Sequence, residues 1–151
     1  MLAVVAVLVA LPVDVAPADA KARAEAYYHY SLGLQSRLSG EAQQALEEYR
    51  KAQKLDPASA PVRTEMARLL MDAGRFDEAL VEAEAAARLD PDDPEAHFTL
   101  ARVLQVQAEI SGNAAALKRS LAEYETTVKL RPGDTLALRT GAKLLDWARA
   151  R

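Results

Sequence analysis

The sequence has no cysteine, which excludes disulfide bonds, zinc sites built on thiolates and catalysis by a cysteine nucleophile. Aromatic residues are also few: one tryptophan, two phenylalanines and five tyrosines in 151 residues. Strands are usually rich in aromatic and β-branched residues, whereas this chain is rich in alanine, which favours helices. The formal net charge is −3, so the chain as a whole lacks the positive field that binding to nucleic acid requires. We therefore expect an all-α protein with no nucleic-acid partner.

Residues 1–20 differ in composition from the rest of the chain. Residues 2–13 form an almost continuous apolar run (LAVVAVLVALPV), followed by two A-x-A patterns that end at Ala20. This arrangement is typical of a secretory signal peptide. We predict that residues 1–20 are such a peptide and that residues 21–151 are exported to a bacterial periplasm or cell envelope. No Lys or Arg precedes the apolar run, so the alternative is an uncleaved or longer leader that anchors the chain in a membrane.

The rest of the chain repeats itself. Three segments end alike, with KLDP at 54–57, RLDP at 88–91 and KLRP at 129–132. The first two of these prolines, Pro57 and Pro91, define a 34-residue period. Small residues, which let neighbouring helices pack closely, fall in register with the prolines. They are Gly33, Ala67, Ala101 and Ala142 in first helices, and Ala45, Ala52, Ala79 and Ala86 in second helices.

The turn sequence Gly74-Arg75-Phe76-Asp77-Glu78-Ala79-Leu80, together with the 34-residue period, resembles the tetratricopeptide repeat family. The resemblance extends over about residues 24–149. It implies a right-handed α-solenoid of helix-turn-helix units, with repeats at about 26–59, 60–93 and 94–134 and a capping helix at 134–149.

Helix start and stop signals agree with this division. Ser59, Asp93 and Asp134 are candidate N-caps, and Gly40 and Gly74 break the chain between paired helices. Seven helices are expected, at about 24–38, 41–54, 60–72, 76–88, 94–110, 114–130 and 134–149.

The third repeat is longer than the other two. The interval from Pro91 to Pro132 exceeds the period by seven residues, and the excess lies between Ala108 and Leu117. We expect about one additional helical turn on each side of a new turn at 111–113. The extension either contacts a partner or is length that a surface loop tolerates.

No arrangement of side chains indicates catalysis, and we expect neither an enzyme nor a bound cofactor or metal. The spacing between His29 and His97 is twice the period, which favours equivalent packing positions over a shared metal site. Asp92-Asp93 is better explained by a helix cap and Glu47-Glu48 by a solvated helix face.

The family resemblance implies a concave groove lined by exposed residues of the first helices. Transferred position by position, it selects Tyr27, Tyr30, Leu34, Arg37, Thr64, Arg68, Met71, Phe98, Arg102, Gln105, Arg139 and Lys143 as partner-binding residues. Over the whole groove, five basic residues face three acidic ones, which are Asp72, Glu95 and Asp146. Such a groove would suit a peptide with acidic and apolar side chains, or a free carboxylate. The alternative is that these residues only form solvated helix faces.

One subtype of the family, the carboxylate clamp of co-chaperones, uses lysine and asparagine at defined groove positions. This chain has Tyr30, Leu34 and Glu65 at those places, so a clamp is not expected. The resulting hypothesis is a protein-binding adaptor or assembly factor. The alternatives are a self-associating structural protein, with Leu144 and Trp147 or the leader region as its contact, and a non-catalytic accessory subunit of an enzyme complex.

Overall fold

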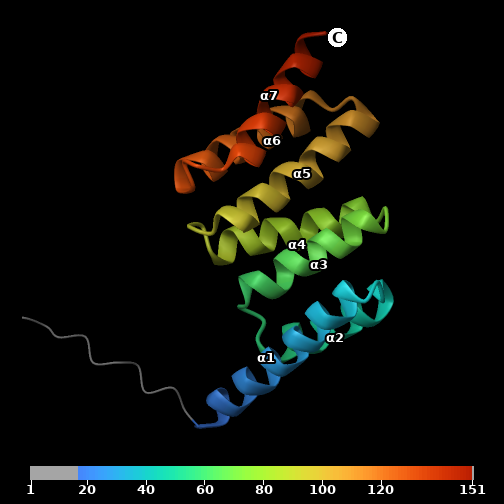
Figure 1. Ribbon diagram of the computed structural model, residues 1–151, viewed down its shortest axis with the longest axis vertical. Helices are drawn as coiled ribbons and strands as arrows, with labels where there is room; N and C mark the ends of the chain where they lie inside the picture. Colours follow the sequence, from blue (N-terminus) through green and yellow to red (C-terminus); the bar gives the residue numbers. More distant parts are fainter. Residues whose placement is uncertain (1–16, 151) are drawn as a thin grey trace, which may run out of the picture.

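The computed structural model describes residues 17–150, and every regular element in that range is a helix. The seven helices are α1 (Pro17–Leu38), α2 (Ala42–Leu55), α3 (Ala60–Asp72), α4 (Phe76–Leu89), α5 (Pro94–Ser111), α6 (Ala114–Leu130) and α7 (Thr135–Arg149). They stack in chain order as an α-solenoid, with α1 and α2 at one end and α7 at the other (Figure 1). None of these described helices is long and apolar enough to cross a membrane.

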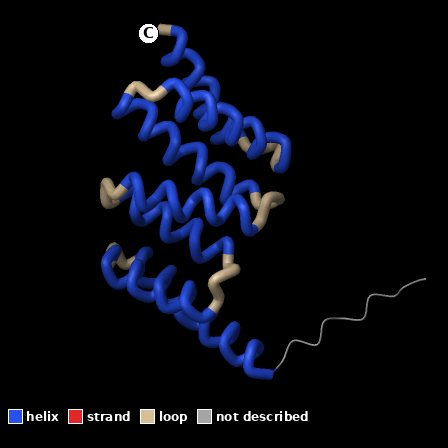
Figure 2. The backbone as a smooth tube through the Cα atoms, turned by 180° about the vertical axis from the view of Figure 1, so that it is seen from behind, coloured by secondary structure: helices blue, strands red, loops and turns tan. Residues whose placement is uncertain are grey.

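The turns lie along the two long edges of the stack (Figure 2). Turns within a pair contain Gly40, Gly74 and Gly112, whose φ angles are 80°, 73° and 67°. Glycine is favoured there because a Cβ disfavours positive φ. Turns between pairs begin after Leu55, Leu89 and Leu130, and they lie along the opposite edge.

Helix α1 is the one helix whose start differs clearly from the sequence prediction. It begins at Pro17 and not near residue 24. Proline is tolerated in the first turn of a helix, and the following alanine, lysine, arginine and glutamate residues are strong helix formers, although they form no apolar stripe. The predicted cleavage point after Ala20 lies inside this helix, and residues 1–16 of the predicted leader lie outside the described residues.

The seven additional residues of the third repeat lengthen its two helices. Helix α5 has 18 residues where α3 has 13, and α6 has 17 where α4 has 14. Gly112 ends α5 in the left-handed conformation, and the Asn113 side chain then accepts hydrogen bonds from the backbone N–H groups of Ala115 and Ala116. This side-chain cap satisfies two of the free donors at the start of α6.

The buried residues of each second helix include three that are spaced four and three apart. These triplets are Ala45, Tyr49 and Ala52 in α2, Ala79, Ala83 and Ala86 in α4, and Ser120, Tyr124 and Thr127 in α6, all between 0% and 2% exposed. The packing is close. A Cβ added at Gly33 would lie 2.4 Å from Cε1 of Tyr49, so only glycine fits beside that ring.

Both histidines bind a glutamate of the second helix in their own pair. His29 Nδ1 lies 2.6 Å from Glu48 Oε2, and His97 Nδ1 lies 2.6 Å from Glu123 Oε2. These equivalent roles explain why the two histidines lie two periods apart. Glu48 is buried, so its expected place on a solvated face is wrong. Hydrogen bonds from Lys51 and then His29 lower the pKa of Glu48, which explains how a carboxylate is accommodated there.

Candidate partner-binding face

A row of alternating charges links the first helices of successive pairs. We call it the charged row; its members are Arg37, Glu65, Arg68, Glu95, Arg131 and Asp134. Arg37 Nε lies 3.2 Å from Glu65 Oε2, and Arg68 Nη1 lies 3.0 Å from Glu65 Oε1. Arg68 also pairs with Glu95, and Arg131 Nη1 is 2.7 Å from Glu95 Oε1. Three bases and three acids cancel, so the row carries no net charge.

The middle of the charged row is withdrawn from water. The Glu65 side chain is 9% exposed and that of Arg68 is 28% exposed. Arg68 Nε also donates to Thr99 Oγ1 at 3.2 Å. At Glu95, burial raises the pKa, but hydrogen bonds from Arg131 and Arg68 outweigh it and hold the pKa below its usual value. These ions therefore stabilise one another and belong as much to the fold as to a binding surface.

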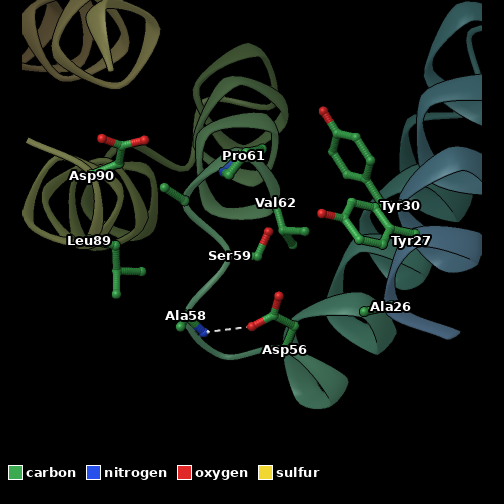
Figure 3. A pocket seen from close by; sticks show the side chains of 11 residues that line it. Ala26, Tyr27, Tyr30, Asp56, Ala58, Ser59, Pro61, Val62, Leu89 and Asp90 are labelled. Carbon is green, nitrogen blue, oxygen red and sulfur yellow. Dashed lines mark hydrogen bonds between the residues drawn. The ribbon is translucent and has the colours of Figure 1, made fainter. Parts of the chain in front are cut away.

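A pocket of about 430 Å³ lies between α1 and the start of α3 (Figure 3). Tyr27 and Tyr30 of α1 form one side, and the turn before α3 and the end of α4 form the other. The apolar part comes from small and aliphatic residues, namely Ala26, Ala58, Ala60, Pro61, Val62 and Leu89, while Ser59, Asp56 and Asp90 supply polar groups. The Asp56 carboxylate accepts from the Ala58 N–H at 3.2 Å, which fixes the turn.

Tyr30 connects this pocket to the core, because its ring lies 5.8 Å from the ring of Tyr49. Tyr49 is fully buried, and its hydroxyl makes no hydrogen bond with any residue in the described part of the chain. Burial and then the charge of Glu65 raise the pKa of Tyr49 to about 12, against a smaller opposing effect of Arg37.

This raised pKa predicts a loss of stability at high pH. The folded-state pKa of Tyr49 lies above the unfolded value of 10.0, so the unfolded chain loses the tyrosine proton at a lower pH than the folded one. The contribution of neutral Tyr49 to stability is therefore complete below pH 10 and is lost as the pH rises from 10 through 12. We expect Tyr49→Phe to be about as stable as the wild type at pH 7 and more stable by up to about 2 kcal/mol near pH 12. Urea unfolding of both proteins across this range measures the difference; a constant difference would contradict the prediction.

The predicted groove residues of the third repeat and the capping helix lie farther along the stack. Phe98 is half-buried, with its ring 5.8 Å from that of Tyr124. Tyr124 donates to the Gln105 side-chain oxygen at 2.7 Å. The exposed cations of this region are Arg102, Arg139 and Lys143, which form no hydrogen bond or ion pair within residues 17–150.

Two predicted groove residues, Thr64 and Met71, are buried. Thr64 is buried and donates its hydroxyl to the Ala60 carbonyl of its own helix, and Met71 is part of the main hydrophobic core. Leu34 is half-buried against the same core. The family positions place these residues near the groove surface, but the depth of each depends on how closely α1 and α3 pack.

Some residues of this face were absent from the sequence prediction. Arg131, Asp56 and Asp90 lie in turns between pairs and not in first helices, so a search of helix faces cannot find them. Glu65 was considered only as a mismatch to a clamp, although its place three residues before Arg68 is a spacing at which opposite charges pair on a helix.

The family model for the tetratricopeptide repeat matches two overlapping segments of the sequence, residues 37–103 and 70–126. Together they cover more than half of the chain. The chain belongs to the tetratricopeptide repeat family. No curated protein matches it in sequence.

Solved structures of tetratricopeptide repeat (TPR) domains have the same fold. The first TPR of Spaghetti (RPAP3) bound to the HSP90 peptide SRMEEVD has a TM-score of 0.76 at 19% identity, covering 85% of this chain and 96% of that one. The TPR domain of Arabidopsis OM64 has a TM-score of 0.75 at 16% identity, covering 83% and 98%. The first TPR domain of human RPAP3 has a TM-score of 0.75 at 17% identity, covering 83% and 94%.

The TPR assignment accounts for the arrangement of the face. In this chain, Arg37, Glu65 and Glu95 come from α1, α3 and α5, the first helices of three successive repeats. A solenoid places equivalent positions of successive repeats side by side, which is why residues about one repeat apart in the sequence meet as ion pairs.

Proposed function

We propose that this TPR protein is a non-catalytic interaction module that binds a segment of a partner protein at the pocket and along the adjoining charged row. The observation that carries the proposal is the pocket itself, in which two tyrosines from α1 face apolar and polar groups of the turn before α3 and of the end of α4. A domain of the same fold, the first TPR of Spaghetti (RPAP3), is bound to an HSP90 peptide in its solved structure. A preformed site of this kind spares the protein the entropy of ordering a binding loop.

The chemistry of the site favours a segment with an apolar side chain next to a basic one. The apolar wall of the pocket can bury the apolar side chain. The carboxylates of Asp56 and Asp90 line the same pocket and can pair with the basic side chain. Arg37 and Arg68, which the sequence prediction assigned to an acidic ligand, already pair with Glu65 and Glu95. Of the predicted groove cations, Arg102, Arg139 and Lys143 form no ion pair within residues 17–150, but none of them lines this pocket.

Tyr27→Ala should weaken binding to the partner without affecting the fold. Tyr27 lines the pocket and is 71% exposed, so its truncation removes contact area for the ligand but almost no core packing. Tyrosine is enriched among interface residues whose truncation costs more than about 2 kcal/mol, which corresponds to roughly thirtyfold in affinity. Affinity capture from an extract of the native organism, followed by titration of the captured protein, measures the change.

Tyr28→Ala is the matched control for this experiment. Tyr28 is the same residue type on the same helix, is 62% exposed and does not line the pocket. We expect the Tyr28→Ala variant to bind the partner with the affinity of the wild type. Equal affinities of the wild type and the Tyr27→Ala variant would place the binding surface elsewhere.

We further propose that the chain works as an adaptor or assembly factor in the bacterial cell envelope. The apolar segment at residues 2–13 and the A-x-A patterns after it support this location. Fractionation of cells that produce the full chain with a C-terminal tag tests it. Recovery in the periplasm or with the membranes supports export, and recovery in the cytoplasm alone excludes it.

A further inference from the structure

The packing within the three helix pairs shows how this chain covers a first helix. In α5, the positions that face the second helix of the pair are His97, Ala101 and Leu104, of which the last two are fully buried. On α6, Ser120, Tyr124 and Thr127 are buried, and Tyr124 shares a core cluster with Ala101. One direct contact is the hydrogen bond from the Ser120 hydroxyl to the Ala101 carbonyl, at 2.7 Å. In α2 and α6 the buried stripe has a small residue, a tyrosine four positions later and a small residue three positions after that, whereas in α4 all three residues are alanine.

Helix α7 has an equivalent face, but no second helix packs against it within residues 17–150. By the repeat register, Leu138, Ala142 and Leu145 correspond to the three positions of α5, yet all three are exposed, the two leucines by 50% and 42%. They border a groove of about 600 Å³ whose other wall is α6, where Leu121 and Val128 contribute apolar side chains. Leu144 and Trp147, which the sequence offered as a self-association patch, instead belong to the core cluster under α7.

One ion pair joins the second helices α4 and α6 next to these stripes. Glu84 follows the central triplet residue of α4, and its carboxylate accepts from Arg119 of α6 at 2.6 Å. Arg119 directly precedes the first triplet residue, Ser120. The residue of α6 that corresponds to Glu84 is Glu125, which lines the open groove. A helix lying in the groove would therefore meet a carboxylate where its own equivalent of Arg119 lies.

We propose that the groove between α6 and α7 binds an amphipathic helix of a partner protein, which packs as the second helix of the fourth repeat. Its stripe has a basic residue followed by a small residue, a large apolar or aromatic residue four positions later and a small residue three positions after that. A second copy of this chain is the poorer occupant. In residues 17–150 the two stripes of this type, in α2 and α6, are already buried.

A peptide copy of α6 tests the proposal, because residues 114–130 contain the whole stripe with Arg119. The peptide is kept helical by a covalent bridge between its positions 118 and 122 and carries a fluorescent label. We expect saturable binding to the full chain by fluorescence anisotropy. Ala142→Arg should weaken it at least about tenfold, because a long charged side chain would enter the groove. The control Arg149→Ala changes an exposed residue of α7 that does not line the groove and should leave the affinity unchanged.

A charge exchange tests the orientation of the helix. Arg119→Glu in the peptide should weaken binding about threefold, the usual range for an exposed ion pair, and Glu125→Arg in the protein should restore it. Amide resonances of Leu138, Ala142 and Leu145 should shift on binding, and Leu138→Glu is a second variant if Ala142→Arg unfolds.

Three results would overturn the proposal: no saturable binding at about 1 mM peptide, binding that Ala142→Arg leaves unchanged, or a dimer of the unliganded chain that Ala142→Arg dissociates. The last would assign the groove to a second copy. Because Tyr27 is remote from this groove in the sequence and lines a different pocket, the Tyr27→Ala variant should still bind the peptide. If the peptide does not bind the groove between α6 and α7, the proposed function of the pocket at Tyr27 is therefore unaffected.

Discussion

Arg68→Glu should lower the free energy of unfolding by about 3–5 kcal/mol, whereas Arg102→Glu should change it by less than about 0.5 kcal/mol. The two arginines occupy equivalent positions of successive repeats, one period apart. Arg68 pairs with both Glu65 and Glu95, so the replacement would bring a third carboxylate next to these two, of which Glu65 is buried. Arg102 is exposed and forms no ion pair within the described residues.

Urea unfolding followed by circular dichroism measures both changes. A double variant, Glu65→Gln with Arg68→Gln, serves as the control, because it removes the buried carboxylate together with its partner. It should be more stable than Arg68→Glu. Similar losses for Arg68→Glu and Arg102→Glu would show that the charged row contributes nothing specific. The expected difference also means that Arg102 is the better residue for testing a role in binding, since loss of binding by an Arg68 variant could reflect unfolding.

Tyr124→Ala should cost about 3–5 kcal/mol, the usual range for removing a buried aromatic side chain. Tyr124 is 2% exposed and belongs to the core cluster that holds α7 to α5 and α6. Its ring contacts Phe98, and its Cβ lies 3.4 Å from where a Cβ of Gly141 would be. Tyr124→Phe keeps this packing and removes only the hydrogen bond to Gln105, so a loss of about 1 kcal/mol is expected.

The loss from Tyr124→Ala should be concentrated at one end of the solenoid. Repeats contact mainly their neighbours, and α7 packs chiefly on α6. Amide hydrogen exchange should therefore show α7 losing protection first, while α1 to α4 keep theirs. Urea unfolding gives the total change, and Tyr124→Phe is the matched comparison. Equal loss of protection along the whole chain would mean that the stack unfolds as a single unit.

The helices of the stack could be predicted from the sequence because their signals are local. The 34-residue period, the small residues at one column of each helix and the turn glycines act through steric contacts between immediate neighbours. Six of the seven helices consequently lie within about one residue of the expected ranges. The start of α1 was missed because its first turns are held by helix propensity alone, without an apolar stripe to mark them.

The functional face could be predicted only in part. Tyr27 and Tyr30 do lie together at a pocket, but its other walls are turns from two further segments, which no single helix pattern brings together. Likewise, Arg37 and Arg68 look like free positive charges along the sequence. Their neutralisation depends on the distance between α1, α3 and α5, which only the packed stack fixes.

The sequence by itself determined the repeat, the helices and the family, since each follows from steric preferences repeated at a fixed period. The tertiary structure alone decided which polar and apolar groups remain available to a partner. Glu48 and Thr64 became buried, Arg68 became part of an ion-pair row, and Leu138 and Leu145 were left exposed. The physical reason is that burial and charge pairing depend on what the neighbouring repeat places opposite each residue. At α7, the described chain places no further helix opposite its outer face.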